Sequence, residues 1–231
     1  MPLSDPNIGL LKAVVRRLDR YSDKFVFLGG CVVGLLITDP ASPDVRPTKD
    51  VDGLIEAITY TEYVEAEKML EKLGFFRSEG PICRWEIDGF LFDMLPQKGN
   101  IAGLENRWLE LVPTNYREYE LSEGSRIKVI DPVLFLGAKI EAFLSRGQND
   151  FLSSHDLEDI VTLINGRGEL VDEVESADLE LRKYIADVFS AWLKERRFLE
   201  AIPGHLNPDV GRVELVLNRF KAMAKFPRVF V

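Results

Sequence analysis

The pattern of apolar residues along this chain changes once, near Asp131-Pro132, and this change constrains the fold more than any other feature. Before it, short apolar stretches with strand character alternate with amphipathic segments, and Gly, Pro and Asp residues separate them. After it, the apolar residues repeat at helical spacing. We therefore predict an α+β fold, with a mixed sheet and flanking helices in residues 1–130 and a packed helical lobe in residues 131–231.

The first part of the chain predicts strands at its short apolar runs and helices at its amphipathic ones. The sequence "KFVFLGG" indicates a buried strand that ends at two glycines, and "CVVGLLITD" indicates a short helix after them. Asp88-Gly89 between two apolar stretches predicts a hairpin whose second strand ends at Pro96. Further elements are expected as helices over 8–21 and 61–75, the second closed by Gly74, and as strands over 50–57 and 126–130. Residues 97–125 give no clear pattern.

The second part predicts a series of helices. Pro132 stands at the favoured first position of one, Ser154 is a candidate N-cap of the next, and Gly166 is its expected stop. The remaining helices are expected as one long segment over 176–202 and a last one over 208–225.

Composition limits the location and the partners of this protein. Its net charge of −9 makes it a poor generic binder of nucleic-acid backbones, because that affinity comes largely from Lys and Arg. Its two cysteines form neither a disulfide framework nor a zinc motif. The most apolar run, residues 25–37, is too short to cross a membrane. We expect a cytoplasmic protein that has no membrane segment.

Three aspartates have the spacing of a metal site. Asp50 and Asp52 stand two apart at the start of a strand, so their side chains share a face, with Cα atoms roughly 6.6 Å apart. Asp93 lies among apolar residues on the second hairpin strand, where an acid is costly without a partner. On a neighbouring strand it would complete an oxygen-rich site suited to Mg²⁺. Read alone, Asp50 and Asp52 are equally compatible with an acidic strand start after a proline-rich loop.

Gly29 and Gly30 add a candidate phosphate site. Glycines at a strand end that opens a helix let a phosphate approach the backbone, and helix N-terminal N–H groups favour an anion. Arg46 and Thr48, which flank the acidic pair, could touch a triphosphate held there, although loop residues of this kind are frequently inert. Such glycine pairs also mark tight strand–helix packing. Together with the aspartates, they predict a nucleoside-triphosphate (NTP) site.

This order of features resembles the nucleotidyltransferase fold of the DNA polymerase β superfamily: strand-Gly-Gly-helix, then "RPTKDVD", then a strand with a lone Asp. The sequence "AKIEAFLSRGQNDFLSSHDLEDI" also resembles a motif of AbiE-type toxins (AbiEii and MenT-like), in which a helix Lys is followed by DxxD. Lys139, Asp156 and Asp159 occupy these positions. The resemblance covers roughly residues 25–165. The chain departs from the superfamily at Gly30, where Ser is frequent, and it is less basic than many AbiE-type toxins.

The resemblance implies a two-metal Mg²⁺ site and transfer of a nucleoside monophosphate from an NTP to an acceptor hydroxyl of an RNA, a protein or a small molecule. Asp50, Asp52 and Asp93 would be the catalytic metal ligands. Gly29, Gly30, Thr48, Lys139, Asp156 and Asp159 would bind the nucleotide. It also implies the possibility of an antitoxin partner. A charge of −9 favours a small cationic acceptor, as in aminoglycoside adenylyltransferases, over tRNA.

Simpler interpretations remain for several of these residues. Lys139 has the surroundings of a lysine that extends to solvent from an apolar helix face, and Asp156 and Asp159 suit the first turn of any helix. A nucleotidyltransferase fold that has lost catalysis and serves as a binding or regulatory protein is the alternative at the level of function. Neither His155 nor His205 has a nucleophilic partner or a metal-ligand spacing in the sequence.

Overall fold

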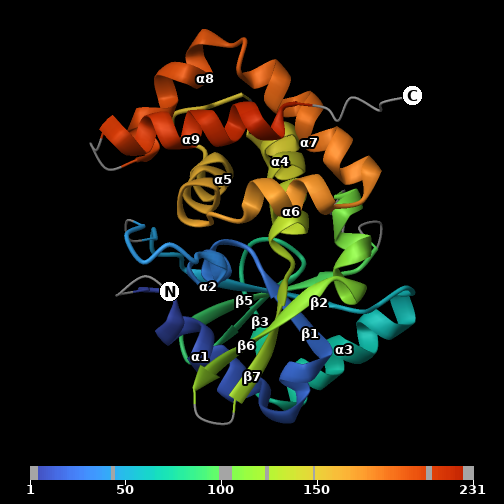
Figure 1. Ribbon diagram of the computed structural model, residues 1–231. Coiled ribbons are helices and arrows are strands. Elements are labelled where there is room, and N and C mark those ends of the chain that lie inside the picture. Colours follow the sequence, from blue (N-terminus) through green and yellow to red (C-terminus); the bar gives the residue numbers. More distant parts are fainter. Residues whose placement is uncertain are drawn as a thin grey trace. The chain divides into compact units, whose positions relative to one another are not determined.

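The computed structural model describes residues 5–42, 45–98, 106–122, 125–147, 149–206 and 210–225. The chain divides into two compact units (Figure 1). Of the described residues, those within 5–35 and 45–134 belong to the sheet unit, and those within 36–42 and 135–225 belong to the helical unit. The helical unit thus includes a segment from the first third of the chain.

The described residues of the sheet unit form a seven-stranded mixed sheet in the order β3-β4-β5-β2-β1-β7-β6. Its strands are β1 Phe25–Leu28, β2 Asp50–Ile55, β3 Phe76–Arg77, β4 Arg84–Ile87, β5 Phe90–Pro96, β6 Tyr116–Ser122 and β7 Ser125–Ile130. The central strands β1 and β2 run antiparallel, whereas β2 pairs with β5 and β1 with β7 in parallel. The segment without a clear sequence pattern contributes β6 and the 3₁₀-helix η4, Arg107–Thr114; its residues 99–105 and 123–124 lie outside the described ranges.

Helices accompany the strands of this unit much as the apolar pattern predicts (Figure 1). They are α1 Ile8–Leu18, η1 Asp19–Lys24, η2 Gly30–Val32, α2 Val33–Leu36 and α3 Tyr60–Lys72. The helix expected over 8–21 changes to 3₁₀ geometry after Leu18, where Asp19 takes a positive φ of 50°. A capping box between Thr59 and Glu62 opens α3, and Gly74 follows its end with a φ of +89°, as expected for that position.

The hairpin predicted at Asp88-Gly89 is confirmed. Strands β4 and β5 pair antiparallel around it, and both turn residues have positive φ, 51° for Asp88 and 80° for Gly89. Positive φ at both positions is the signature of the two-residue type I′ turn. The side chain of Asp88 pairs with Arg17, so this acid belongs to the turn and its surface.

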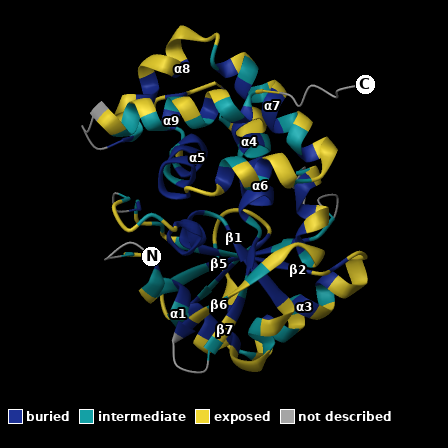
Figure 2. Ribbon diagram, in the orientation of Figure 1, coloured by how far each residue is buried: buried dark blue, intermediate teal, exposed yellow. Residues whose placement is uncertain are grey.

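One face of the sheet is aromatic and tightly packed. Phe25, Phe27 and Phe92 are fully buried; the rings of Phe25 and Phe92 meet edge to face with centroids 5.3 Å apart. Gly53 lies beneath them, since a Cβ there would stand 2.7 Å from the ring of Phe92. Buried residues run along the central strands of this unit (Figure 2). Because side chains alternate along each strand, the polar residues described below, which alternate with these buried ones, project from the opposite face of the sheet.

The described helices of the helical unit are α4 Pro132–Arg146, α5 His155–Gly166, α6 Leu170–Ser176, α7 Leu179–Trp192, α8 Arg196–Ala201 and α9 Val210–Met223, with a 3₁₀-helix, η5, at Ile202–His205. The single long helix predicted over 176–202 is wrong, because α7 ends at Trp192 and α8 begins at Arg196. On a continuous helix, Trp192 and Phe198 would lie on different sides. The break brings both rings into one cluster, with centroids 5.5 Å apart, and Phe151 packs against each.

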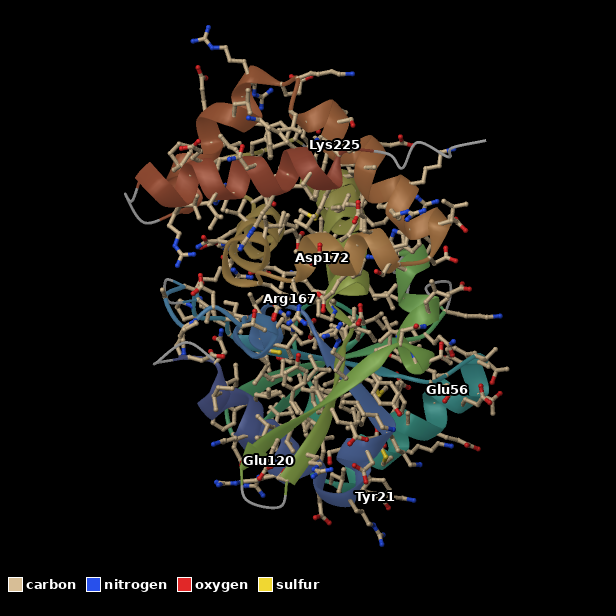
Figure 3. All side chains as sticks on the ribbon, in the orientation of Figure 1. Tyr21, Glu56, Glu120, Arg167, Asp172 and Lys225 are labelled. Atoms are coloured by element: carbon tan, nitrogen blue, oxygen red, sulfur yellow. The ribbon has the colours of Figure 1, made fainter. Side chains whose placement is uncertain are left out.

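The early segment of the helical unit is fixed to the end of α5. The backbone N–H groups of Thr38 and Asp39 donate to the Gly166 carbonyl at 3.0 and 2.9 Å. Arg167, which follows α5 and is labelled in Figure 3, donates to the Leu36 carbonyl at 2.7 Å. A side chain at Gly166 would stand 2.8 Å from Ile37, so this glycine permits the close approach of the two segments.

Candidate active site

Residues on four neighbouring strands stand in one row across the sheet. The register pairs Leu28 with Asp52, Asp52 with Asp93, and Asp93 with Arg84. Residues paired in this way project to the same face. Asp50, two residues before Asp52 on β2, projects to that face as well. The structure therefore brings the three predicted aspartates together on one face of the adjacent strands β2 and β5.

Arg84 joins two of these aspartates. Its Nε donates to Asp93 Oδ1 at 2.8 Å, and its Nη2 donates to Asp93 Oδ2 at 2.7 Å and to Asp50 Oδ2 at 2.8 Å. The Asp93 side chain is only 9% exposed, so this bidentate pair compensates a charge that would be costly alone. The hydrogen bonds that Asp93 accepts, followed by the charges of Asp93 and Asp50, raise the pKa of Arg84 further above its ordinary value. The guanidinium is therefore a permanent cation at this site.

The loop that precedes Asp50 is held by a buried asparagine. Asn7, which is 1% exposed, donates from its side chain to the Arg46 carbonyl at 2.9 Å and accepts from the Thr48 backbone N–H at 2.8 Å. The Thr48 hydroxyl in turn donates to Asp50 Oδ1 at 2.8 Å. Asn7 thus positions Thr48, and Thr48 orients the Asp50 carboxylate, leaving Oδ2 for Arg84.

Gly29 lies directly against Asp52. It has a φ of 75°, and a Cβ at this position would collide with the Asp52 carboxylate. Both observations explain why position 29 favours glycine: the backbone is left-handed and the acid of the next strand approaches closely. The predicted phosphate site and the acidic row are therefore adjacent in space.

Gly30 is buried and begins the 3₁₀ turn η2, which continues into α2. The helix predicted after the glycines is thus short, Gly30–Val32 in 3₁₀ geometry and Val33–Leu36 in α geometry. A helix of this length has a small dipole, so a phosphate here would depend mainly on individual N–H groups.

Cys83 is buried beside the row. Burial, followed by the charges of Asp93 and Asp52, raises the pKa of its thiol to about 11. Because the thiolate is the reactive form, we expect iodoacetamide to modify Cys83 very slowly at pH 8 and faster as the pH rises toward 11. Mass mapping of the alkylated peptide measures this, with urea-unfolded protein as the reactive control. Rapid labelling of the folded protein at pH 8 would contradict the expectation.

A second charged cluster lies inside the helical unit, between α4 and α5. Lys139 Nζ stands 2.7 Å from Asp159 Oδ2 and 3.0 Å from Asp156 Oδ1, with side-chain exposures of 12% for the lysine, 2% for Asp159 and 8% for Asp156. Arg146 also donates to both oxygens of Asp156, at 2.9 and 3.0 Å. Burial alone would lower the pKa of Lys139, but the charges of Asp159 and Asp156 outweigh it and raise that pKa. The three residues predicted from the Lys–DxxD pattern thus form one buried ionic cluster.

Sequence reasoning missed Arg84 and Asn7. For Arg84 a signal was present, because in a hairpin centred between Asp88 and Gly89 the numbers of any two paired residues have the same sum. Residue 84 is therefore opposite Asp93. For Asn7 we find no such signal, because its partners lie 39 and 41 residues away in a loop.

The carboxylates of Asp50, Asp52 and Asp93 are the candidate donor set for Mg²⁺. Its oxygens are the ligands that this ion prefers, and they come from adjacent strands. As they stand, no three or more His, Cys, Asp or Glu side chains of the described ranges are grouped to hold one metal ion. Asp50 and Asp93 do not form such a group because both carboxylates are turned toward Arg84. The cation that stands at these two acids in the structure is therefore the guanidinium of Arg84.

Neither a family model nor a curated protein matches this chain. Among solved structures, JHP933 from Helicobacter pylori matches 96% of this chain and 93% of its own, with a TM-score of 0.50 and 10% identity. The two proteins share a fold. A nucleotidyltransferase-like antigenic protein from Paracoccidioides brasiliensis matches 86% of this chain and 94% of its own at 19% identity, with a TM-score of 0.45 that is too low to argue from.

The observed elements and the likeness to JHP933 confirm the predicted α+β class, a mixed sheet with flanking helices followed by further helices. At 10% identity this likeness concerns the fold alone. In the described residues, no helix has the length and apolar character needed to span a membrane.

Proposed function

We propose that this protein is a Mg²⁺-dependent nucleotidyltransferase that moves a nucleoside monophosphate from an NTP to an acceptor hydroxyl. The observation that carries the proposal is the shared face of Asp50, Asp52 and Asp93, beside the strand end where Asp52 meets Gly29. Few structural reasons exist to gather three carboxylates on one face of a sheet. A site for hard cations next to a left-handed glycine suits a triphosphate.

The chemistry assigns a role to each residue. The acceptor oxygen attacks the α-phosphorus, a new P–O bond forms, and the bond to pyrophosphate breaks. Bound Mg²⁺ would supply the positive charge that favours the attacking oxygenate and the departing pyrophosphate. Asp50 and Asp52 would hold both ions, and Asp93 would hold one and help to take up the acceptor proton.

The nucleotide would be held around this row. Gly29 and Gly30 would accommodate the triphosphate, and Thr48 would keep Asp50 in place. A nucleotide contact of Lys139, Asp156 and Asp159 is a separate proposal, because these residues lie in the helical unit and form ion pairs with one another there.

The test is incubation with each of the four α-³²P-labelled NTPs and MgCl₂, together with total RNA, total protein or a metabolite extract. We expect label to enter one acceptor class from one preferred NTP, with pyrophosphate released in equal amount. Transfer to RNA would support the AbiE-type assignment and a search for an antitoxin partner. Transfer to a cationic metabolite would support a small-molecule adenylyltransferase. Absence of transfer from all four NTPs to all three pools would refute the proposal.

A second candidate has an observation of its own. If the protein is a catalytically inactive binding or regulatory protein of this fold, the guanidinium of Arg84 replaces the metal permanently as the counterion of Asp50 and Asp93. Calorimetry with ATP and CTP, with and without Mg²⁺, separates the two. Nucleotide binding that depends on Mg²⁺ favours the enzyme, and binding that is indifferent to it favours the inactive protein.

A further inference from the structure

The positive charge at the acidic row comes from one side chain that uses the same oxygens as a metal would. Arg84 occupies both oxygens of Asp93 and one oxygen of Asp50, at 2.7 to 2.8 Å. A divalent ion ligated by Asp50 and Asp93 would need at least one of these three oxygens, because both oxygens of Asp93 accept from Arg84. It would also stand within a few ångströms of the guanidinium, where like charges repel strongly in a partly buried site.

We propose that Arg84 is the resident counterion of this carboxylate site, and that a divalent cation binds Asp50 and Asp93 only by displacing it. The inference deepens the proposed function, on which its choice of metal rests, and concerns a residue that the nucleotidyltransferase resemblance does not assign. Arg84 thereby sets the metal affinity of the protein before any nucleotide is present.

The surroundings of Arg84 allow it to leave. It is the first residue of β4, and its side chain is 21% exposed, so the guanidinium lies at the edge of the site rather than deep inside it. Four rotatable bonds let the guanidinium reach water without a change in the strand.

The arrangement has a selective consequence. A monovalent ion such as Na⁺ or K⁺ gains little by replacing an arginine that makes three charge-assisted hydrogen bonds. A divalent ion that arrives with a triphosphate brings both a higher charge and a compensating anion. The carboxylates would therefore stay neutralised, and Asp93 would stay buried and paired, until the metal–nucleotide complex is present.

Manganese binding to the nucleotide-free protein tests this proposal. Electron paramagnetic resonance measures free Mn²⁺ in a titration of the wild type, Arg84→Gln and Arg77→Gln. We expect Arg84→Gln to bind one Mn²⁺ at least tenfold more tightly than the wild type, since its competitor is gone. Arg77→Gln is the matched control: Arg77 lies on β3 and pairs with Glu67, away from the row, so its Mn²⁺ affinity should not change. Adding Asp93→Asn to Arg84→Gln should abolish the gain.

A measurement on the wild type covers the case in which Arg84→Gln folds poorly. The Arg84 Nε–H, bonded to Asp93, should give a sharp ¹H–¹⁵N signal that Mg²⁺ with a non-hydrolysable ATP analogue broadens or shifts. A signal that stays unchanged at saturating Mg²⁺–nucleotide overturns the proposal, as does equal or weaker Mn²⁺ binding by folded Arg84→Gln. Tighter Mn²⁺ binding without nucleotide transfer by the wild type upholds this proposal and refutes the proposed function alone.

Discussion

Replacing Asp50 with asparagine is expected to lower the rate of nucleotide transfer about a thousandfold, because a lost carboxylate ligand removes several kcal/mol of charge stabilisation from the transition state. The melting temperature should change little. Asparagine keeps the Oδ1 that accepts from Thr48, and Arg84 keeps its bidentate pair with Asp93. Single-turnover transfer of label and thermal unfolding of the same preparation measure the two effects.

The hairpin turn provides the control for this variant. Asp88→Asn removes the same charge from the same unit, at a turn residue with a φ of 51° that asparagine tolerates well. Its transfer rate should equal that of the wild type. If Asp50→Asn transfers nucleotide at the wild-type rate, the aspartates do not hold a catalytic metal, and the proposed mechanism fails.

Replacing Lys139 with methionine is expected to destabilise the protein by about 3 kcal/mol, because removing one partner of a buried ionic cluster leaves uncompensated charge behind. Arg146 would still pair with Asp156, whereas Asp159, whose side chain is 2% exposed, would lose its ion pair with Lys139. Urea unfolding followed by circular dichroism measures the free energy.

Arg146→Met is the matched control, since it also deletes a cation bound to Asp156. The Arg146 side chain is 69% exposed, so water screens its charge, and a loss below about 1 kcal/mol is expected. Equal losses for the two variants would show that burial of Lys139 does not govern the stability of the cluster. Comparing nucleotide affinity of the two variants separates a phosphate contact of Lys139 from its structural role.

Most of the sheet unit could be predicted because its signals are local. The Asp88-Gly89 turn specifies its own hairpin, Gly74 ends α3, and period-two spacing places Asp50 and Asp52 on one face. What local patterns could not supply is which strands become neighbours. The parallel pairing of β2 with β5 sets Asp52 beside Asp93, and it depends on loop closures that the residues of neither strand encode.

In the helical unit, the sequence did not predict where one helix ends and the next begins. The residues between Trp192 and Phe198 include no Gly or Pro, and nothing local marks the break between α7 and α8. The break follows from an aromatic cluster whose members come from separate helices, such as Phe143 on α4 and Phe220 on α9. Tertiary packing overrode the helix propensity of "LKE" at residues 193–195.

The role of Arg84 also depends on a contact with another strand, its pairing with Asp93. In the sequence Arg84 is one cation in an acidic chain, and only the register of the hairpin, which places it opposite Asp93, indicates its role.

The attachment of residues 36–42 to the end of α5 has a consequence for synthesis of this protein. The Leu36 carbonyl and its donor Arg167 are 131 residues apart, as are Thr38 and its partner Glu169. At ordinary rates of translation, the early segment leaves the ribosome on the order of ten seconds before its partners exist. Its apolar residues, including Ile37, must remain exposed for that interval. Nascent chains stalled before α5 should therefore be a preferred substrate for chaperones that bind exposed apolar segments.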